Sequence, residues 1–447
     1  MDEVEKSHAS ADTEALGGTY PGTSAIPSPA VKVPPRIRLR QQKLHLTFVG
    51  YVVVLTMFTA LQVLGVWFFT LGFLLSRQVL PDIAECTPNL VAAVDDTCMP
   101  PQFDKVVMLV IDALRFDFTV PVEDSANPEQ PSSEFFHNNF PILHETFLSQ
   151  PQNAIHLKFM ADPPTTTLQR LKGLTTGTLP TFIDAGSNFD GDSVDEDNWL
   201  LQLHKHNKTV AFMGDDTWKA MFSKYIDPTL NFPYDSLNVR DLHTVDNGVL
   251  EHMWPLLRES GTKQKWDVLI GHFLGVDHVG HRYGPNHYTM KEKLNQMNEV
   301  IKEVMKTLDN KTLLVVMGDH GMDSTGNHGG EASDELESTF FMYLKRKFVH
   351  KKDKAFYDPR QRGKNYRTIN QIDLVPTISL LLGLPIPHNN LGFPVDEVFG
   401  DRELTIGAFK TLVQIQKFRA QTPSLSQNDA LNEEYTLLYR DFTEQVS

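Results

Sequence analysis

Six residues of the chain have the types and spacing that metal binding requires. They are three aspartates and three histidines in four short segments: Asp112, Asp277 with His281, Asp319 with His320, and His328. Carboxylate oxygen and imidazole nitrogen are the ligands that zinc and manganese accept where thiolates are absent. Three residues of each type can form two sites of three ligands, which predicts two divalent cations, with zinc preferred over manganese. With a deprotonated nucleophile such a site is nearly neutral, so a phosphodiester anion could approach it.

Each segment alone has a simpler explanation. An aspartate after a strand often caps a helix, and pairs of surface histidines occur without any metal. The segment Gly318-Asp319-His320-Gly321-Met322, followed by His328 in a glycine-rich loop, is more specific, because glycines let the backbone fold tightly around a cation. The ordered combination therefore favours a catalytic metal site over a purely structural role.

A threonine-rich segment could supply a nucleophile. Thr165, Thr166 and Thr167 follow two prolines and precede a predicted helix. A metal ion lowers the pKa of a hydroxyl group that it binds, and the N-terminus of a helix favours the resulting alkoxide. The same threonines could merely cap the helix, and their spacing alone leaves both interpretations open.

Short apolar segments precede these polar residues and are predicted to be buried strands. They comprise residues 106–111, 210–213, 267–274 and 313–317. Residues 290–308 and 371–382 have helical spacing, and Gly383 is expected to end the second helix. This alternation predicts an α/β fold with a mostly parallel sheet flanked by helices. Ligands of such sheets bind beyond the carboxyl ends of the strands, which is where the acidic residues stand.

Residues 46–75 are predicted to cross a membrane as one helix. The segment has no charged residue, and a bilayer requires about 20 apolar residues. A buried core helix seldom stays uncharged for so long, and a cleaved signal peptide has a shorter apolar stretch. Four basic residues precede the segment: Arg36, Arg38, Arg40 and Lys43. By the positive-inside rule the N-terminus should be cytoplasmic and the remainder luminal.

The chain is accordingly divided into a cytoplasmic, disordered basic tail (1–45), the transmembrane helix (46–75), a luminal linker (76–100), a luminal catalytic domain (101–400) and a helical C-terminal linker (401–447). Cys86 and Cys98 are expected to form a disulfide if this region is luminal, with two free thiols as the alternative. Asn207 and Asn310 begin N-glycosylation tripeptides, which suits a luminal glycoprotein. The net charge of −15 gives no electrostatic basis for binding nucleic acid.

These segments resemble the alkaline phosphatase superfamily, and within it the GPI ethanolamine phosphate transferases. The similarity lies in Val-Ile-Asp-Ala-Leu-Arg-Phe-Asp around Asp112, in Asp-His-Val-Gly-His from Asp277, and in the segment around Asp319. The threonine block from Pro163 to Phe189 is most similar to the type 3, or PIG-O, branch. The resemblance spans about residues 46–400 and implies an alkaline-phosphatase-like fold.

The resemblance also implies roles for individual residues. One metal ion would be held by Asp277, His281 and His328, and the other by Asp112, Asp319 and His320. Thr167 would be the nucleophile, bound to the metals between the two groups, because it stands ten residues before Gly177 of a Thr-Gly pair. Thr165 and Thr166 are the alternatives. Asn188 would bind the oxyanion.

The implied reaction moves phosphoethanolamine from phosphatidylethanolamine to a mannose, the third, of the GPI glycolipid precursor. It would proceed through a phosphoethanolamine-threonine intermediate at the endoplasmic reticulum membrane. Family members also carry a long C-terminal bundle of membrane helices, so a chain that ends at Ser447 is expected to be a truncated form. Its acceptor site and its contact with a small PIG-F-type membrane subunit would then be incomplete. The alternatives are a hydrolytic phosphodiesterase and a truncated, non-catalytic protein that binds a partner.

Overall fold

The structure is a computed structural model that describes residues 34–73, 77–86, 98–122, 134–179, 181, 193–259, 265–350, 366–422, 433–434 and 436–438. The chain divides into two compact units, Met1–Leu71 and Gly72–Ser447. Each unit is described by itself.

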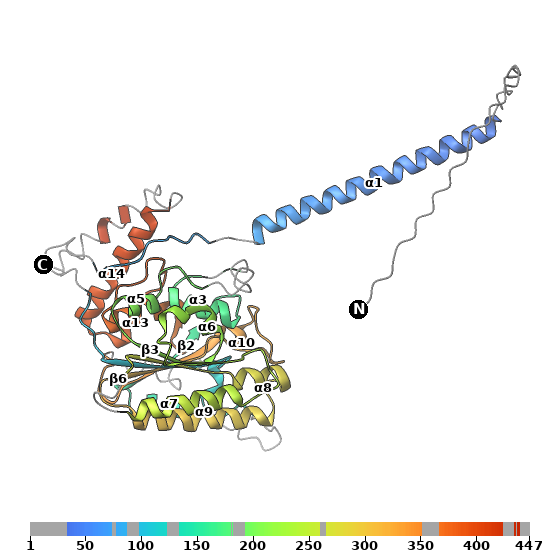
Figure 1. Cartoon of the computed structure of the whole chain (residues 1–447). Coiled ribbons are helices and arrows are strands. Elements are labelled where there is room, and N and C mark those ends of the chain that lie inside the picture. The colour runs from blue at the N-terminus through green and yellow to red at the C-terminus, as the bar shows by residue number, and fades with distance from the viewer. Residues whose placement is uncertain are drawn as a thin grey trace, which may run out of the picture. The chain divides into compact units, whose positions relative to one another are not determined.

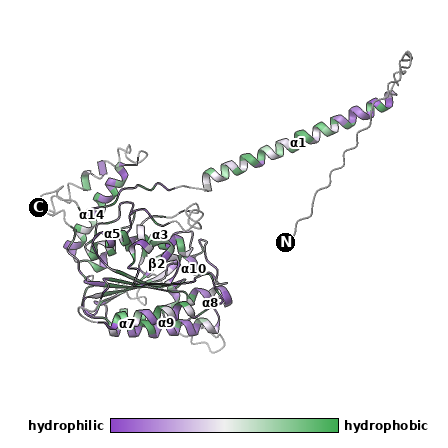
Figure 2. Cartoon of the chain, in the orientation of Figure 1, coloured by the Kyte–Doolittle hydropathy of each residue, from purple (hydrophilic) through white to green (hydrophobic). Residues whose placement is uncertain are grey.

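Helix α1 (Pro35–Phe73) dominates the described part of the first unit. It begins earlier than Leu46, and so it includes the basic residues that the sequence placed in a tail. Proline suits the first position of a helix because its missing N–H would have no intrahelical partner there. Most of the helix is coloured as hydrophobic in Figure 2. Its apolar side chains are exposed, unlike those of a core helix. The helix is long and apolar enough to cross a membrane, which agrees with the predicted apolar span.

The second unit is built on one sheet, which Figure 1 shows edge-on. The sheet has eight strands in the order β4-β3-β5-β1-β6-β7-β2-β8. The strands are β1 (Lys105–Ile111), β2 (Ala154–Met160), β3 (Val210–Asp215), β4 (Asn231–Tyr234), β5 (Val268–Phe273), β6 (Thr312–Met317), β7 (Glu337–Tyr343) and β8 (Thr368–Asn370). Strand β7 runs antiparallel to both of its neighbours, and the other pairings are parallel. The predicted mostly parallel sheet is confirmed.

Helices cover both faces of this sheet, as Figure 1 shows. The α-helices of the second unit are α2 (Ile142–Ser149), α3 (Thr167–Thr176), α5 (Trp199–Lys205), α6 (Thr217–Phe222), α7 (Thr244–Arg258), α8 (Gly275–Tyr283), α9 (Tyr288–Thr307), α10 (Ser333–Leu336), α13 (Leu374–Leu382) and α14 (Asp401–Ala420). Short 3-10 turns are η1 (Phe116–Phe118), η2 (Ser223–Tyr225), η4 (Gln371–Asp373) and η5 (Asp396–Val398).

The core consists of two apolar layers, one on each face of the sheet. Alternate residues of β1 point to opposite faces, so Met108 packs in the layer with α3, α5 and α13, and Leu109 packs in the layer with α7 and α9. The four predicted strands are present as β1, β3, β5 and β6, and the predicted helices are α9 and, with its preceding 3-10 turn, α13. Gly383 ends α13 in the left-handed conformation, with φ of 71°, as predicted.

The described part of the predicted linker packs against the second unit through specific polar contacts. Arg77 forms an ion pair with Glu196, and the backbone N–H of Ala84 donates to Asp197 Oδ2 at 2.7 Å. Cys86 and Cys98 form a disulfide, which confirms the predicted pairing. Residues 77–86 therefore form part of the folded unit.

Candidate active site

The residues predicted to bind metals lie at the carboxyl ends of three neighbouring strands. Asp112 directly follows β1, and Asp319 and His320 follow β6. Helix α8 follows β5 and carries Asp277 and His281. Because β5, β1 and β6 are adjacent and parallel, their carboxyl ends meet at one edge of the sheet.

The first group consists of Asp112, Asp319 and His320, and all three side chains are buried. His320 Nε2 lies 3.4 Å from Asp112 Oδ1 and 3.3 Å from Asp319 Oδ2. His320 Nδ1 lies 2.8 Å from the carbonyl oxygen of Gly321, so this nitrogen carries the proton and donates. The lone pair of Nε2 therefore points toward the two carboxylates, which is the tautomer that metal binding requires.

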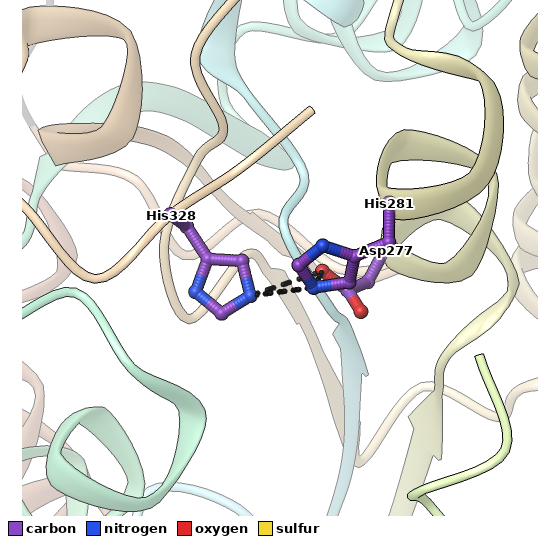
Figure 3. Close-up of side chains that lie close together, drawn as sticks. All are labelled: Asp277, His281 and His328. Carbon is purple, nitrogen blue, oxygen red and sulfur yellow. Dashed lines mark hydrogen bonds and ion pairs between the residues drawn. The ribbon is translucent and has the colours of Figure 1, made fainter. Parts of the chain in front are cut away.

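The second group consists of Asp277, His281 and His328 (Figure 3). Asp277 Oδ1 lies 3.4 Å from Nε2 of each histidine, and the two Nε2 atoms lie 3.0 Å apart. His328 Nδ1 donates to the carbonyl oxygen of Thr165 at 2.8 Å, which again leaves Nε2 free. Burial lowers the pKa of His328, but the hydrogen bond and charge of Asp277 raise it to about 9. A cation at this position would replace that proton.

Backbone geometry brings the two chain segments of the second group together. The loop with His328 approaches α8 at Gly326, where φ is 85° and an added Cβ would overlap the carbonyl oxygen of Gly280. Only glycine adopts this conformation readily and permits this approach. The glycine-rich loop thereby places His328 against the helix that carries Asp277 and His281.

Both groups fit a divalent cation. Among the described residues, one buried carboxylate oxygen of each aspartate has no hydrogen-bond partner: Asp112 Oδ1, Asp277 Oδ1 and Asp319 Oδ2. A buried, unpartnered carboxylate oxygen is costly, and a coordinated cation removes that cost. Burial, together with the charge of Asp112, raises the pKa of Asp319 well above its usual range, as expected where a positive charge is lacking.

The three threonines differ in what their hydroxyl groups contact. Thr165 Oγ1 donates to the carbonyl oxygen of Gly330 and accepts from the N–H of Gly329, both at 2.9 Å. Thr166 hydrogen-bonds to Gln169.

Thr167 is the first residue of α3, and its hydroxyl faces the first ligand group. Its Oγ1 donates to Asp112 Oδ2 at 3.3 Å and lies 3.4 Å from His320 Nε2. Of the three threonines, Thr167 alone presents its hydroxyl to a ligand group.

The chain is similar to known proteins over most of its length. A family model described as Type I phosphodiesterase / nucleotide pyrophosphatase matches residues 158–373, in agreement with the predicted alkaline-phosphatase-like fold class. GPI ethanolamine phosphate transferase 3 of Eremothecium gossypii is 49% identical over 397 residues, which cover 88% of this chain and 38% of the relative. The Saccharomyces cerevisiae protein of the same name is 50% identical over 372 residues, covering 83% and 35%. Over most of its length the chain is similar to GPI ethanolamine phosphate transferases 3.

The chain spans 38% and 35% of the lengths of these two relatives. Among solved structures, the integral membrane lipooligosaccharide phosphoethanolamine transferase A from Neisseria meningitidis is similar with 14% identity and a TM-score of 0.42, over 66% of this chain and 57% of that one.

A third cluster, Asp112, Asp215 and His272, also has the composition of a metal site. However, the indole N–H of Trp218 donates to His272 Nδ1 at 2.9 Å, and an indole cannot accept a hydrogen bond. Neutral His272 must then carry its proton on Nε2, which lies 3.3 Å from Asp112 Oδ2. Protonated His272 carries a proton there as well.

His272 therefore directs an N–H toward Asp112 in either form and has no lone pair to offer a metal at Nε2. Burial lowers the pKa of His272, whereas its contacts with Asp112 and Asp215 raise it. Burial raises the pKa of Asp112, but the hydrogen bond with His272 and the charge of His320 bring it well below its usual range. His272 therefore helps to keep Asp112 ionised and oriented.

No role was predicted from the sequence for Asp215, His272 or Trp218. Asp215 ends a strand, as the predicted ligands do, so the same rule could have found it. His272 lies inside β5 between apolar residues, and nothing in its sequence neighbourhood marks it. Asn188, which was predicted to bind the oxyanion, lies outside the described residues.

A cavity of about 340 Å³ opens onto the site. Its walls include Asp112, Asp277 and Thr167, and so it reaches both ligand groups. The other polar and apolar lining residues are Thr166, Gln169, Asp215, Thr217, Ser236, His278, His281, His328, Leu168, Leu237, Val239 and Leu274. The cavity therefore gives a ligand access to both groups.

Proposed function

We propose that the chain is a metal-dependent phosphoethanolamine transferase that uses phosphatidylethanolamine as donor and a mannose of the GPI glycolipid precursor, the third, as acceptor. The position of the Thr167 hydroxyl, 3.3 Å from Asp112 Oδ2 and 3.4 Å from His320 Nε2, carries the proposal. The identity of 49–50% to two GPI ethanolamine phosphate transferases 3 supports the choice of substrates.

Two divalent cations, zinc by preference and manganese as the alternative, are the proposed cofactors. Asp277, His281 and His328 would hold one cation, and Asp112, Asp319 and His320 would hold the other. When bound, the pair would lower the pKa of the Thr167 hydroxyl and neutralise charge on the phosphoryl oxygens. Aspartate and histidine without cysteine match the ligand preferences of both metals.

In the first step, Thr167 Oγ1 attacks the phosphorus of phosphatidylethanolamine. The Oγ1–phosphorus bond forms, and the bond from phosphorus to the glycerol oxygen breaks. The released diacylglycerol oxygen takes up one proton to balance the proton that Thr167 gives up. Asp112 Oδ2 accepts the hydrogen bond of Thr167 and so orients Oγ1 for the attack. The N-terminus of α3 stabilises the negative charge that develops there.

In the second step, the acceptor hydroxyl attacks the phosphoethanolamine-threonine. A bond from the sugar oxygen to phosphorus forms, the Oγ1–phosphorus bond breaks, and Thr167 regains a proton as the sugar hydroxyl loses one. The same orienting contacts serve both steps, because the second reverses the first with a different alcohol. Asn188 is proposed to bind the oxyanion in each step.

The proposed setting is the endoplasmic reticulum membrane, with α1 as the anchor and the second unit in the lumen. The proposed division of the chain is a tail (1–45), a membrane span (46–75), a linker (76–100), a catalytic domain (101–400) and a C-terminal segment (401–447). A small PIG-F-type membrane subunit is the proposed partner. The apolar character of α1 and the relatives in GPI biosynthesis support this placement.

A hydrolytic phosphodiesterase is the second candidate. The matching family model is described as a phosphodiesterase, and the same ligand groups would serve water as the final acceptor. Free phosphoethanolamine would then be the product, in place of a modified glycan.

The test is to incubate the full chain in detergent with zinc and phosphatidylethanolamine labelled in its head group, and to locate the label by mass spectrometry. We expect label on Thr167, and its loss in Thr167→Ala and in Asp319→Ala. Thr166→Ala, which changes the adjacent hydroxyl, is the matched control and should still be labelled at Thr167. Label on a different residue, or none in a chain with both metals bound, would overturn the proposal. Adding a mannose-containing GPI precursor and measuring where the label goes separates transfer from hydrolysis.

A further inference from the structure

Three aspartates line the catalytic cavity, and two of them belong to the ligand groups. Asp112 and Asp277 contribute to the first and second groups, respectively. Asp215 is the third, and the proton on His272 Nε2 excludes a metal site built from Asp215, His272 and Asp112. One carboxylate in the wall of the cavity is therefore left without a role in the proposed chemistry.

Asp215 ends β3 and is 1% exposed. Its Oδ1 accepts from the N–H of Thr217 at 2.8 Å, and the Thr217 hydroxyl also hydrogen-bonds to the carboxylate. Nδ1 of His272 lies 3.8 Å from Asp215 Oδ2 and accepts from Trp218. In the part of the chain that the structure describes, no lysine or arginine pairs with Asp215. Burial raises the pKa of Asp215, so a cation in the cavity would offset the cost of its charge.

The position of Asp215 matches the length of a phosphoethanolamine group. One of its carboxylate oxygens lies within 4.8 Å of an Asp112 carboxylate oxygen, and Thr167 Oγ1 lies 3.3 Å from Asp112 Oδ2. Thr167 and Asp215 thus both lie close to Asp112. In the donor, only an oxygen and two carbons separate the phosphorus from the ammonium nitrogen. A phosphorus bound at Thr167 therefore leaves the ammonium group within reach of Asp215.

We infer that Asp215 binds the ammonium group of the donor and selects donors that carry a short primary amine. This inference rests on the proposed transferase reaction and adds a subsite to it. A structural alternative exists, since the bond from Asp215 to Thr217 also secures the start of α6. The two roles predict different results, because a structural bond does not distinguish charged from neutral donors.

Two aryl donors test the inference: 4-nitrophenyl phosphoethanolamine, and 4-nitrophenyl propyl phosphate, in which a methyl group replaces the ammonium. The full chain in detergent with zinc is assayed for nitrophenolate release and for mass added to Thr167. The natural chain should prefer the ammonium donor in kcat/KM by about 10- to 100-fold, the effect of one charge-assisted hydrogen bond. Asp215→Asn should reduce this ratio to near one and leave the rate with the propyl donor almost unchanged.

Asp216→Asn is the matched control, because the adjacent carboxylate is bonded to Ser236 and should not affect the ratio. Asp215→Ser is a second variant, smaller and still able to accept from Thr217, in case the first does not fold. Bound zinc, measured by elemental analysis, should be unchanged in all variants.

Equal losses with both donors, or an unchanged ratio, in the Asp215 variants would overturn the subsite and leave the transferase reaction in place. If the natural chain with zinc bound labels Thr167 with neither donor, the transferase reaction itself fails and the inference fails with it. The two failures are therefore distinguishable.

Discussion

At the scale of single residues, each candidate ligand is oriented by contacts made with its other atoms. His320 and His328 each donate from Nδ1 to a backbone carbonyl, so both present Nε2 to the site. Asp112 is oriented by the Nε2–H group of His272. The indole N–H of Trp218 donates to Nδ1 of His272 and so keeps the histidine proton on Nε2. Such outer contacts fix the tautomer and direction of a ligand, and removing one typically weakens metal binding by about 10- to 100-fold.

The first prediction concerns His272. His272→Leu should weaken metal binding at the group with Asp112 by about 10- to 100-fold, because Asp112 loses its donor. His272→Gln should recover part of the affinity, because its amide can place an N–H near the position of Nε2. Zinc affinity is measured by competition with a chromogenic chelator, without any assay of activity.

His206→Leu is the control for this series, since it removes an exposed histidine on α5's C-terminal cap. If His272→Leu binds two zinc ions as tightly as the natural chain, His272 does not orient Asp112.

The second prediction concerns pH and His156, a buried histidine away from the ligand groups. Burial, with a smaller effect from His144, lowers its pKa to about 3 from its usual 6.5. The unfolded chain therefore binds this proton more readily than the folded one. The contribution to stability is complete above about pH 6.5 and is lost as the pH falls toward 3. Where the unfolded chain binds one proton more than the folded chain, the free energy of unfolding changes by about 1.4 kcal/mol per pH unit.

His156→Gln removes this titration and retains an amide that can bond to Thr119. Between pH 6 and 5 the free energy of unfolding of this variant should decrease by about 1.4 kcal/mol less than that of the natural chain. Urea denaturation of the full chain in detergent at several pH values measures the difference. Parallel curves for the two proteins would mean that His156 has the same pKa in the folded and the unfolded chain.

Residue types and spacing in the sequence predicted the six ligands and two sites, because the ligands stand at strand ends or in a glycine-rich loop. The family resemblance divided them into the two triads that the structure brings together. His272 could not be found this way, since it lies within a strand and gains its role from Trp218, which is distant in sequence. The choice of Thr167 over Thr165 came only from family resemblance. The structure adds a physical reason, because the loop with Gly330 occupies the Thr165 hydroxyl.

At the scale of elements, α8 is positioned by a buried ion pair. Asp246 of α7 accepts from the N–H groups of Leu274 and Gly275, both at 3.0 Å, and so holds the start of α8. Its other oxygen pairs with Lys293 of α9 at 2.8 Å, and both charged side chains are buried. Three helices are thereby joined at the point from which Asp277 projects.

The third prediction is that Lys293→Met destabilises the chain by about 3–5 kcal/mol, because Asp246 is left buried and unpaired. Zinc binding to the group on α8 should weaken in the same variant. Denaturant unfolding and chelator competition measure the two effects.

Lys302→Met changes an exposed lysine on the same helix that pairs with Glu299, and its effect should be between 0 and about 1 kcal/mol. Similar effects of the two substitutions would show that the buried pair does not support α8.

The apolar segments predicted the parallel centre of the sheet, but the direction of β7 and the existence of β2 were not predicted. Strand β2 contains His156 and Lys158, and β7 begins with Glu337, which weakens the apolar signal. Between β6 and β7 the chain forms only a loop and the short helix α10, and neither crosses the sheet. Strand β7 therefore starts at the edge where β6 ends and runs antiparallel to β6. That connection depends on the loop with His328, whose path the sequence did not predict.

At the scale of the whole molecule, the chain combines an exposed apolar helix with a unit whose cavity is lined by carboxylates. Residues 77–86 belong to the second unit through Arg77, Ala84 and the Cys86–Cys98 disulfide, so few residues separate this unit from α1. A disulfide is typical of an oxidising compartment, and basic residues at the start of α1 favour a cytoplasmic N-terminus. Both features favour a second unit in the lumen.

The fourth prediction follows from that placement. Asn207 and Asn310 are exposed and begin Asn-Lys-Thr tripeptides, so a luminal second unit should carry two N-linked glycans in a eukaryotic host. Asn207→Gln and Asn310→Gln should each increase gel mobility by one glycan, and the double variant should match the enzymatically deglycosylated chain. Asn295→Gln, an exposed asparagine without the tripeptide, is the control and should not shift. If the natural chain carries no glycan and its second unit is digested by protease in intact microsomes, the unit faces the cytoplasm. The orientation inferred from the basic residues would then be reversed, and the donor would have to be drawn from the cytoplasmic leaflet.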